Sequence, residues 1–259
     1  MWRHPGARMG SVITLVFFAW WAFNTMAYFA TLYYQQVNLL GALETSLRFI
    51  PMAVAGFSVD VFAGYAMGRT PGQMLILLGL SGTVVAPLLF ALVDVDSSYW
   101  AVMFLVMIFV VGADVIYPVG NLHIASTFDE DSQSLAGGVF NVATRLGTSI
   151  GLAVTSSIAT AISEKYASAY PSLLPNSPEV LMVGFRAAGW TCFTAAMLAF
   201  LIGLVGLRGI GIVGQRKTVP ILAEGTTDSS AIHLTAAETD VKSLTGRGPV
   251  EAKSQPTSA

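Results

Sequence analysis

The chain has 259 residues, of which 54% are hydrophobic and 11% are charged, whereas a soluble domain carries about 25% charged residues. A net charge of −2, with no basic run interleaved with aromatic residues, excludes a nucleic-acid-binding protein. The single cysteine, Cys192, excludes an intrachain disulfide, and no Cys/His group has the spacing of metal ligands. The composition therefore predicts an integral membrane protein whose main solvent is the lipid bilayer.

Six apolar stretches follow one another along most of the chain, and each is long enough for a membrane-spanning helix, which needs about 20 residues. The first follows Arg3 and Arg8, as in a signal peptide, but its apolar part continues to Tyr34 and is too long for one. Polar and turn-forming residues separate the stretches and indicate loops. We predict six membrane-spanning helices, at residues 10–34, 43–67, 73–93, 99–122, 135–161 and 181–207.

The distribution of basic residues predicts the orientation. If the helices alternate, most lysine and arginine residues near helix ends fall on the side of both termini, which the positive-inside rule assigns to the cytoplasm. Residues 1–9 are then a cytoplasmic segment, residues 10–213 the membrane domain, and residues 214–259 a cytoplasmic tail. Because the tail lacks apolar runs, we expect it to be disordered. We expect a multi-pass protein of the plasma membrane.

Three predicted helices carry a charged residue well inside the apolar run: Asp60, Asp114 and Arg145. At the helical rise per residue, all three lie roughly 10 to 15 Å from the predicted cytoplasmic ends, so we expect one buried charge network. Two interpretations remain open. The network is either a structural Asp–Arg pair that fixes helix packing or a site of proton coupling. Coupling requires that one aspartate lack a basic partner, because a nearby arginine favours the ionised carboxylate.

Uncharged polar side chains share these helices and the first one. Residues Asn141, Arg145 and Ser149 recur every four positions and therefore lie on one helix face. The residues expected to line a cavity are Asn24, Tyr117, Asn141, Thr148 and Ser149.

Other residues predict packing. Gly147 and Gly151 form a G-x-x-x-G motif, which favours close approach of another helix. Pro118 predicts a kink, since it removes a backbone hydrogen bond. Tyr33 and Tyr34 are expected in an interfacial aromatic belt. The helices at 73–93 and 181–207, which carry few polar groups, are expected to face lipid.

The sequence contains no motif of an enzyme. No serine, histidine and acid fall at catalytic spacing, no Gly-rich phosphate loop ends in Gly-Lys-Ser/Thr, and no H-E-x-x-H is present. We therefore expect no catalytic residues, no metal and no cofactor.

Several motifs, in their order and spacing, resemble the major facilitator superfamily, and within it the C-terminal half of fungal fourteen-helix drug:proton antiporters. The resemblance covers residues 20–207. The motifs are TLYYQQ (31–36), SLRFIP (46–51), GRTPG (68–72) and SLAGG (134–138), the last continuing through Asn141 to Gly147, Gly151 and Ala153.

The resemblance implies an all-α integral membrane fold in which six helices form one half of the transporter, as two inverted three-helix repeats. It also implies proton-coupled efflux of small organic compounds, drugs or metabolites, and a role in multidrug resistance. Expected partners are the bilayer, a small-molecule substrate, protons, and either a missing N-terminal half or a second copy of the chain.

The resemblance covers one half of such a transporter, although substrate lies between two halves in this superfamily. The sequence leaves several alternatives open. The chain is a fragment, the product of a mispredicted gene start, a half-transporter that pairs with a second copy, or a truncated, non-transporting membrane protein or assembly or regulatory partner.

Overall fold

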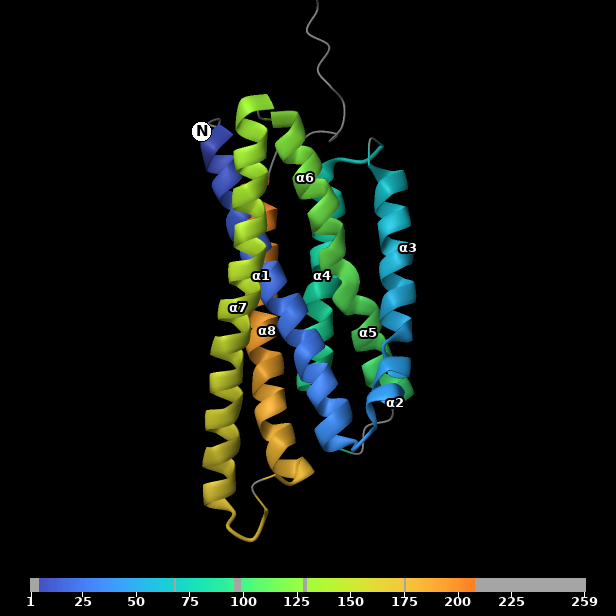
Figure 1. The fold of residues 1–259 in the computed structure, drawn as a ribbon, viewed down its shortest axis with the longest axis vertical. Helices are drawn as coiled ribbons and strands as arrows, with labels where there is room; N and C mark the ends of the chain where they lie inside the picture. Colours follow the sequence, from blue (N-terminus) through green and yellow to red (C-terminus); the bar gives the residue numbers. More distant parts are fainter. Residues whose placement is uncertain (1–4, 68, 96–98, 128–129, 175, 208–259) are drawn as a thin grey trace, which may run out of the picture. The chain divides into compact units, whose positions relative to one another are not determined.

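The structure, a computed structural model, describes residues 5–67, 69–95, 99–127, 130–174 and 176–207, all within one compact unit, Met1–Arg216. These residues form helices joined by short connections, with no strand among them (Figure 1). Six helical segments are long and apolar enough to cross a membrane, which confirms the predicted fold. The predicted tail and residues 1–4 lie outside the described residues.

The observed elements follow the predicted order with different boundaries. The long helices are continuous, whereas the second and fourth spans are each built from shorter segments. The elements are α1 (Pro5–Leu32), the π-helix η1 (Tyr33–Val37), α2 (Ala42–Arg48), α3 (Ile50–Ala66), α4 (Gly72–Ala91), the π-helix η2 (Tyr99–Met103), α5 (Phe104–Val110), the 3₁₀-helix η3 (Val111–Val115), α6 (Ile116–Thr127), α7 (Glu130–Ala169) and α8 (Pro178–Gly206).

The second span divides where proline requires it. Pro51 stands in the first turn of α3, a position that needs no backbone N–H, so α2 ends at Arg48 and α3 begins two residues later. The preceding connection contains Leu39 at φ 53°, the left-handed region that ordinarily favours glycine.

The fourth span is irregular one turn before the predicted kink. Proline at position 118 cannot donate to the carbonyl of Asp114, four residues earlier. The backbone tightens into η3 at this point, between α5 and α6. The physical cause predicted from Pro118 thus fits the observed segment, while the irregularity itself lies on its N-terminal side.

Close helix contacts depend on glycine. A Cβ on Gly147 would meet backbone atoms of Phe17 in α1, and one on Gly151 would meet the ring of Trp21. The G-x-x-x-G motif therefore packs α7 against α1, as predicted. Gly79 of α4 and Gly112 of η3 approach each other in the same manner.

The tyrosines at the end of the first span are in the core. Tyr33 and Tyr34 are 1% and 0% exposed, and their rings lie 5.6 Å apart. The prediction of an interfacial belt was wrong, because the Tyr33 ring packs against Phe90 of α4, the Tyr34 ring packs against Phe49, and α8 and α2 lie against η1.

Helices α3 and α7 stand on the two flanks of the described bundle (Figure 1). Only 11% of the most apolar stretch of the second span and 22% of that of the fifth are buried, compared with 56% for the third, α4. The helices α4 and α8 pack against each other and against α1. Their exposed large side chains, which include Leu78 and Leu201, are mostly apolar, as expected of a surface toward lipid.

Candidate functional site

A hydrogen bond joins two of the predicted cavity residues across α6 and α7. Tyr117 Oη donates to Asn141 Oδ1 at 2.9 Å, and Asn141 Nδ2 in turn donates to Gly137 O at 3.0 Å. Tyr117 is 38% exposed and Asn141 is also exposed, so both remain open to a ligand. The pair presents a phenol and an amide on one face.

Helix α1 contributes an aromatic ring to this pair. The Trp20 ring centroid lies 5.7 Å from that of Tyr117, and the Phe140 ring lies 5.6 Å from Tyr117 on the α7 side. Asn24, one turn after Trp20, donates from Nδ2 to Trp20 O at 3.2 Å. Three helices thus bring aromatic and amide groups together, an arrangement suited to a small, partly apolar ligand.

The other two predicted cavity residues lie further along α7. Thr148 Oγ1 donates to Thr144 O within the helix at 3.0 Å, and Ser149 is exposed. Within the described parts of the chain, neither makes a hydrogen bond to Tyr117 or Asn141.

The two aspartates approach each other where α3 crosses η3. A Cβ placed on Gly56 of α3 would lie 3.7 Å from Asp114 Oδ2. Asp60 stands four residues after Gly56 and therefore on the same face of α3, the face that packs on η3. Asp114 is partly buried, whereas Asp60 is exposed on the flank.

Arg145 does not join the aspartates. It is exposed on α7, and no ion pair between it and Asp60 or Asp114 is formed among the residues that the structure describes. The expected three-residue buried network is therefore not assembled within this chain, because α3 and α7 lie on opposite flanks and share no substantial contact. No cluster of three or more potential metal ligands occurs in the described segments.

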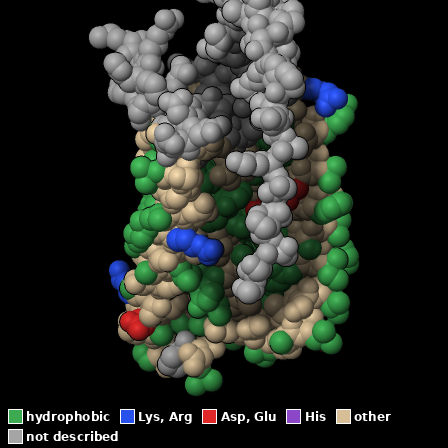
Figure 2. All heavy atoms as spheres, turned by 45° about the horizontal axis from the view of Figure 1, so that its top comes forward, with side chains coloured by type: hydrophobic (Ala, Val, Ile, Leu, Met, Phe, Trp, Pro, Cys, Tyr) green, Lys and Arg blue, Asp and Glu red, His purple; other side chains and the backbone are tan. Residues whose placement is uncertain are grey.

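The space-filling view shows a hollow in the bundle, with acidic side chains visible in it and hydrophobic side chains along both flanks (Figure 2). Trp20 and Phe140 were not among the residues predicted from the sequence to line a cavity. Their contact with Tyr117 depends on the tertiary arrangement.

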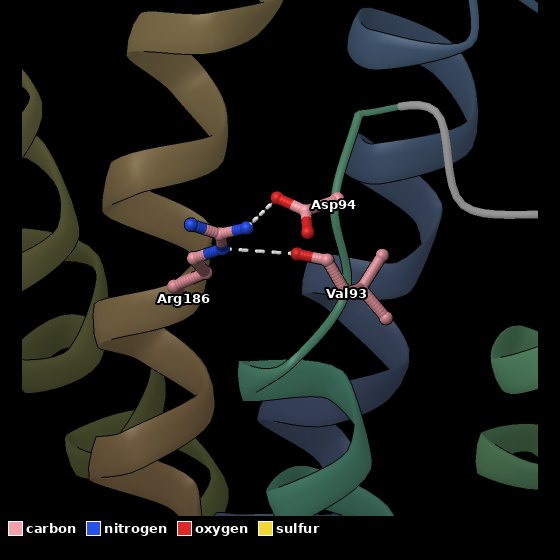
Figure 3. Close-up of polar contacts among 3 residues, drawn as sticks. All are labelled: Val93, Asp94 and Arg186. Carbon is pink, nitrogen blue, oxygen red and sulfur yellow. Dashed lines mark hydrogen bonds and ion pairs between the residues drawn. The ribbon is translucent and has the colours of Figure 1, made fainter.

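At the other end of the bundle, an ion pair and a hydrogen bond connect α8 to the residues that follow α4. Arg186 Nε donates to Val93 O at 2.9 Å, and its Nη2 pairs with the Asp94 carboxylate (Figure 3). The two side chains are 38% and 73% exposed, so solvent screens the ion pair.

Residues 1–152 match the family model described as Major Facilitator Superfamily. The chain is similar to MFS-type transporter 1 of Pyricularia oryzae, with 35% identity over 83% of this chain and 37% of the relative. It is also similar to the low affinity ammonium transporter of Saccharomyces cerevisiae, with 24% identity over 57% of this chain and 29% of the relative. A third relative is the efflux pump terJ of Aspergillus terreus, with 23% identity over 54% of this chain and 28% of the relative. The chain spans 37% or less of the length of these relatives.

Proposed function

Because this chain belongs to the major facilitator superfamily, we propose that it forms one half of a proton-coupled transporter that exports small organic compounds. The observation that carries the coupling proposal is the packing of α3 on η3, where Asp114 lies beside Gly56 and Asp60 stands one turn further along the same face of α3. A carboxylate pair at bilayer depth, with no basic partner among the described residues, changes the local charge when a proton binds or leaves.

The cluster of Trp20, Tyr117 and Asn141 supports a substrate wall on the same half. It combines aromatic surface with hydrogen-bonding groups, which together orient a partly apolar solute. That one relative is named an efflux pump supports export as the direction.

Exposure of α3 and α7 supports the need for a second half. These two flanks carry Asp60 and Arg145, whose charges have no ion-pair partner within the described chain. Charges at bilayer depth ordinarily face protein or a water-filled path, so a second half that covers these flanks would shield them from lipid. The second half is either a further segment of the same protein or a second copy of this chain. A blot of the tagged native protein, with mapping of the 5′ end of its transcript, distinguishes the two. A product about twice this size favours a single-chain antiporter.

Proton coupling is tested in proteoliposomes loaded with the pH dye pyranine. Addition of rhodamine 6G to proteoliposomes that contain the native-length protein is expected to produce a proton flux that depends on rhodamine 6G. Asp114→Asn and Asp60→Asn remove a carboxylate without changing size, and we expect each to abolish that flux. Asp94→Asn, at the far end of α4, is the matched control and should retain it. Unchanged flux in both first variants would contradict coupling through this pair.

The alternative is that the chain is a non-transporting membrane protein. The chain covers 37% or less of the length of its relatives, and this partial coverage is compatible with that alternative. This alternative predicts no rhodamine 6G flux in the unmodified protein, and it predicts that Arg145→Ala lowers folding yield without any substrate-dependent effect. A loss of flux at normal yield would argue against it.

A further inference from the structure

A second hollow lies between α1, α7 and α8, at the end of the bundle remote from the N-terminal residues. Its volume is about 530 Å³, within the range of about 300 to 1,000 Å³ for small-molecule sites. Aromatic, hydroxyl, amide and carboxyl groups all line it. They include Tyr28, Phe29, Gln36, Thr160, Glu164 and Phe185.

The contact of Arg186 with Asp94 places this pocket at the membrane surface. The 20 residues of α4 span about 30 Å, the thickness of the hydrocarbon core. Asp94 follows the end of α4, so Arg186 marks the level at which lipid tails end. Phe185 lies beside Arg186, and the pocket extends from there toward the start of α8 at Pro178.

The length of α7 supports the same placement. Its 40 residues extend about 60 Å, about twice the hydrocarbon thickness. The pocket residues of α7 belong to its last third, and α7 continues past the end of α4 on this side of the bundle (Figure 1). A charged ligand can therefore reach the pocket from water without crossing lipid.

The chemistry of the lining selects for positive charge. Glu164 is the one charged side chain among the described lining residues, and it makes no ion pair in the described chain. Tyr28 leaves 43% of its surface exposed, and its ring lies 5.5 Å from that of Phe29. Phe29 in turn meets Phe185 edge to face at 5.6 Å. A carboxylate beside aromatic faces is the combination that binds organic ammonium ions.

We propose that this pocket binds an organic cation with an apolar body, at the membrane surface and apart from the cluster around Tyr117. Two sources share this chemistry, namely a soluble organic cation and the choline headgroup of a phospholipid. The site is separate from the proposed coupling residues, so binding here does not depend on transport.

The proposal is tested by equilibrium binding of radiolabelled tetraphenylphosphonium to the full chain in maltoside micelles, after subtraction of binding to empty micelles. Glu164→Gln keeps the size of the side chain and removes its charge. A cation a few ångströms from a half-hydrated carboxylate loses at least about fivefold in affinity when the charge is removed. Tyr28→Leu removes one aromatic face, and we expect it to weaken binding about threefold or more.

Matched controls are available on the same molecule. Glu179→Gln, at the exposed start of α8 but outside the pocket, and Tyr65→Leu, an exposed aromatic on α3, should each stay within twofold of the unmodified chain. Radiolabelled tetraphenylborate has the same shape with negative charge, and its binding, measured separately, should be absent. Competition by dihexanoylphosphatidylcholine would identify a headgroup site, whereas competition by benzyltrimethylammonium alone would identify a site for soluble cations. Equal binding of phosphonium and borate, or an unchanged affinity of Glu164→Gln, would overturn the proposal.

Discussion

The crossing of α1 and α7 can be tested by comparing two glycines of α7, Gly147 and Gly138, which differ in what an added Cβ would meet. A Cβ on Gly147 would meet the carbonyl oxygen of Phe17, with the carbonyl carbon and Cα of Phe17 at 3.0 and 3.1 Å. All three are backbone atoms, so α1 itself has to move. A Cβ on Gly138 meets nothing within 4 Å. Alanine substitutions at the two sites therefore differ mainly in this steric clash.

The magnitude follows because the helix-propensity gain of Gly→Ala, about 0.5 to 1 kcal/mol, is common to both sites. The difference in the free energy of unfolding between Gly147→Ala and Gly138→Ala then equals the overpacking cost, about 1 to 3 kcal/mol. With about 2 to 4 °C per kcal/mol for a chain of this size, Gly147→Ala should melt roughly 2 to 12 °C below Gly138→Ala.

The chain supplies its own reporter for this measurement. Cys192 is the single cysteine and is 0% exposed, so a thiol-reactive fluorogenic dye labels it only as the bundle opens. Melting curves of both variants and the unmodified protein are recorded in the same detergent. Gly138→Ala should melt at or above the unmodified chain. Equal melting temperatures for the two variants would refute the assignment of this crossing as a backbone contact.

Two further predictions concern stability and use the same melting assay. Arg186→Gln should cost about 1 to 3 kcal/mol, because the buried carbonyl of Val93 loses its donor, whereas Asp94→Asn should cost less than about 1 kcal/mol, since the ion pair is solvent-screened. Equal losses would indicate that the charge, and not the carbonyl contact, is the stabilising part. Leu39→Gly should raise the free energy of unfolding by up to about 1 kcal/mol, because glycine adopts positive φ without a steric cost. The control, Leu43→Gly in α2, should lower it by a similar amount, and a loss at both positions would contradict the argument from φ.

The number and order of the spans could be predicted from the sequence, because the run of apolar residues needed to cross a bilayer is a local property. The predicted segment 135–161 lies inside α7, but the helix continues to Ala169. The additional two turns are polar, and the hydropathy criterion that located the span excludes them. The burial of Tyr33 was not predictable in this way, because it depends on α8 and α2, which are distant in sequence or follow a turn.

The candidate site shows the same division between local and tertiary information. The four-residue spacing correctly places Asn141 and Arg145 on one exposed face of α7. It could not show that Tyr117 bonds to Asn141, since that contact requires the α6–α7 hairpin. The distance from the predicted cytoplasmic helix ends likewise placed Asp60 and Arg145 at the same depth in the membrane. That distance does not show on which flank of the bundle each helix lies.

The continuity of α7 has a mechanical consequence. The helix contains no proline between Glu130 and Ala169, so it behaves as a stiff rod about 60 Å long. A rotation of about 5° about one end displaces the other end by about 5 Å over such a length. A tilt of α7 that accompanies a change at Asn141 therefore produces a larger displacement of the connection after Ala169. A spin label placed in that connection would report the motion of α7 at Asn141.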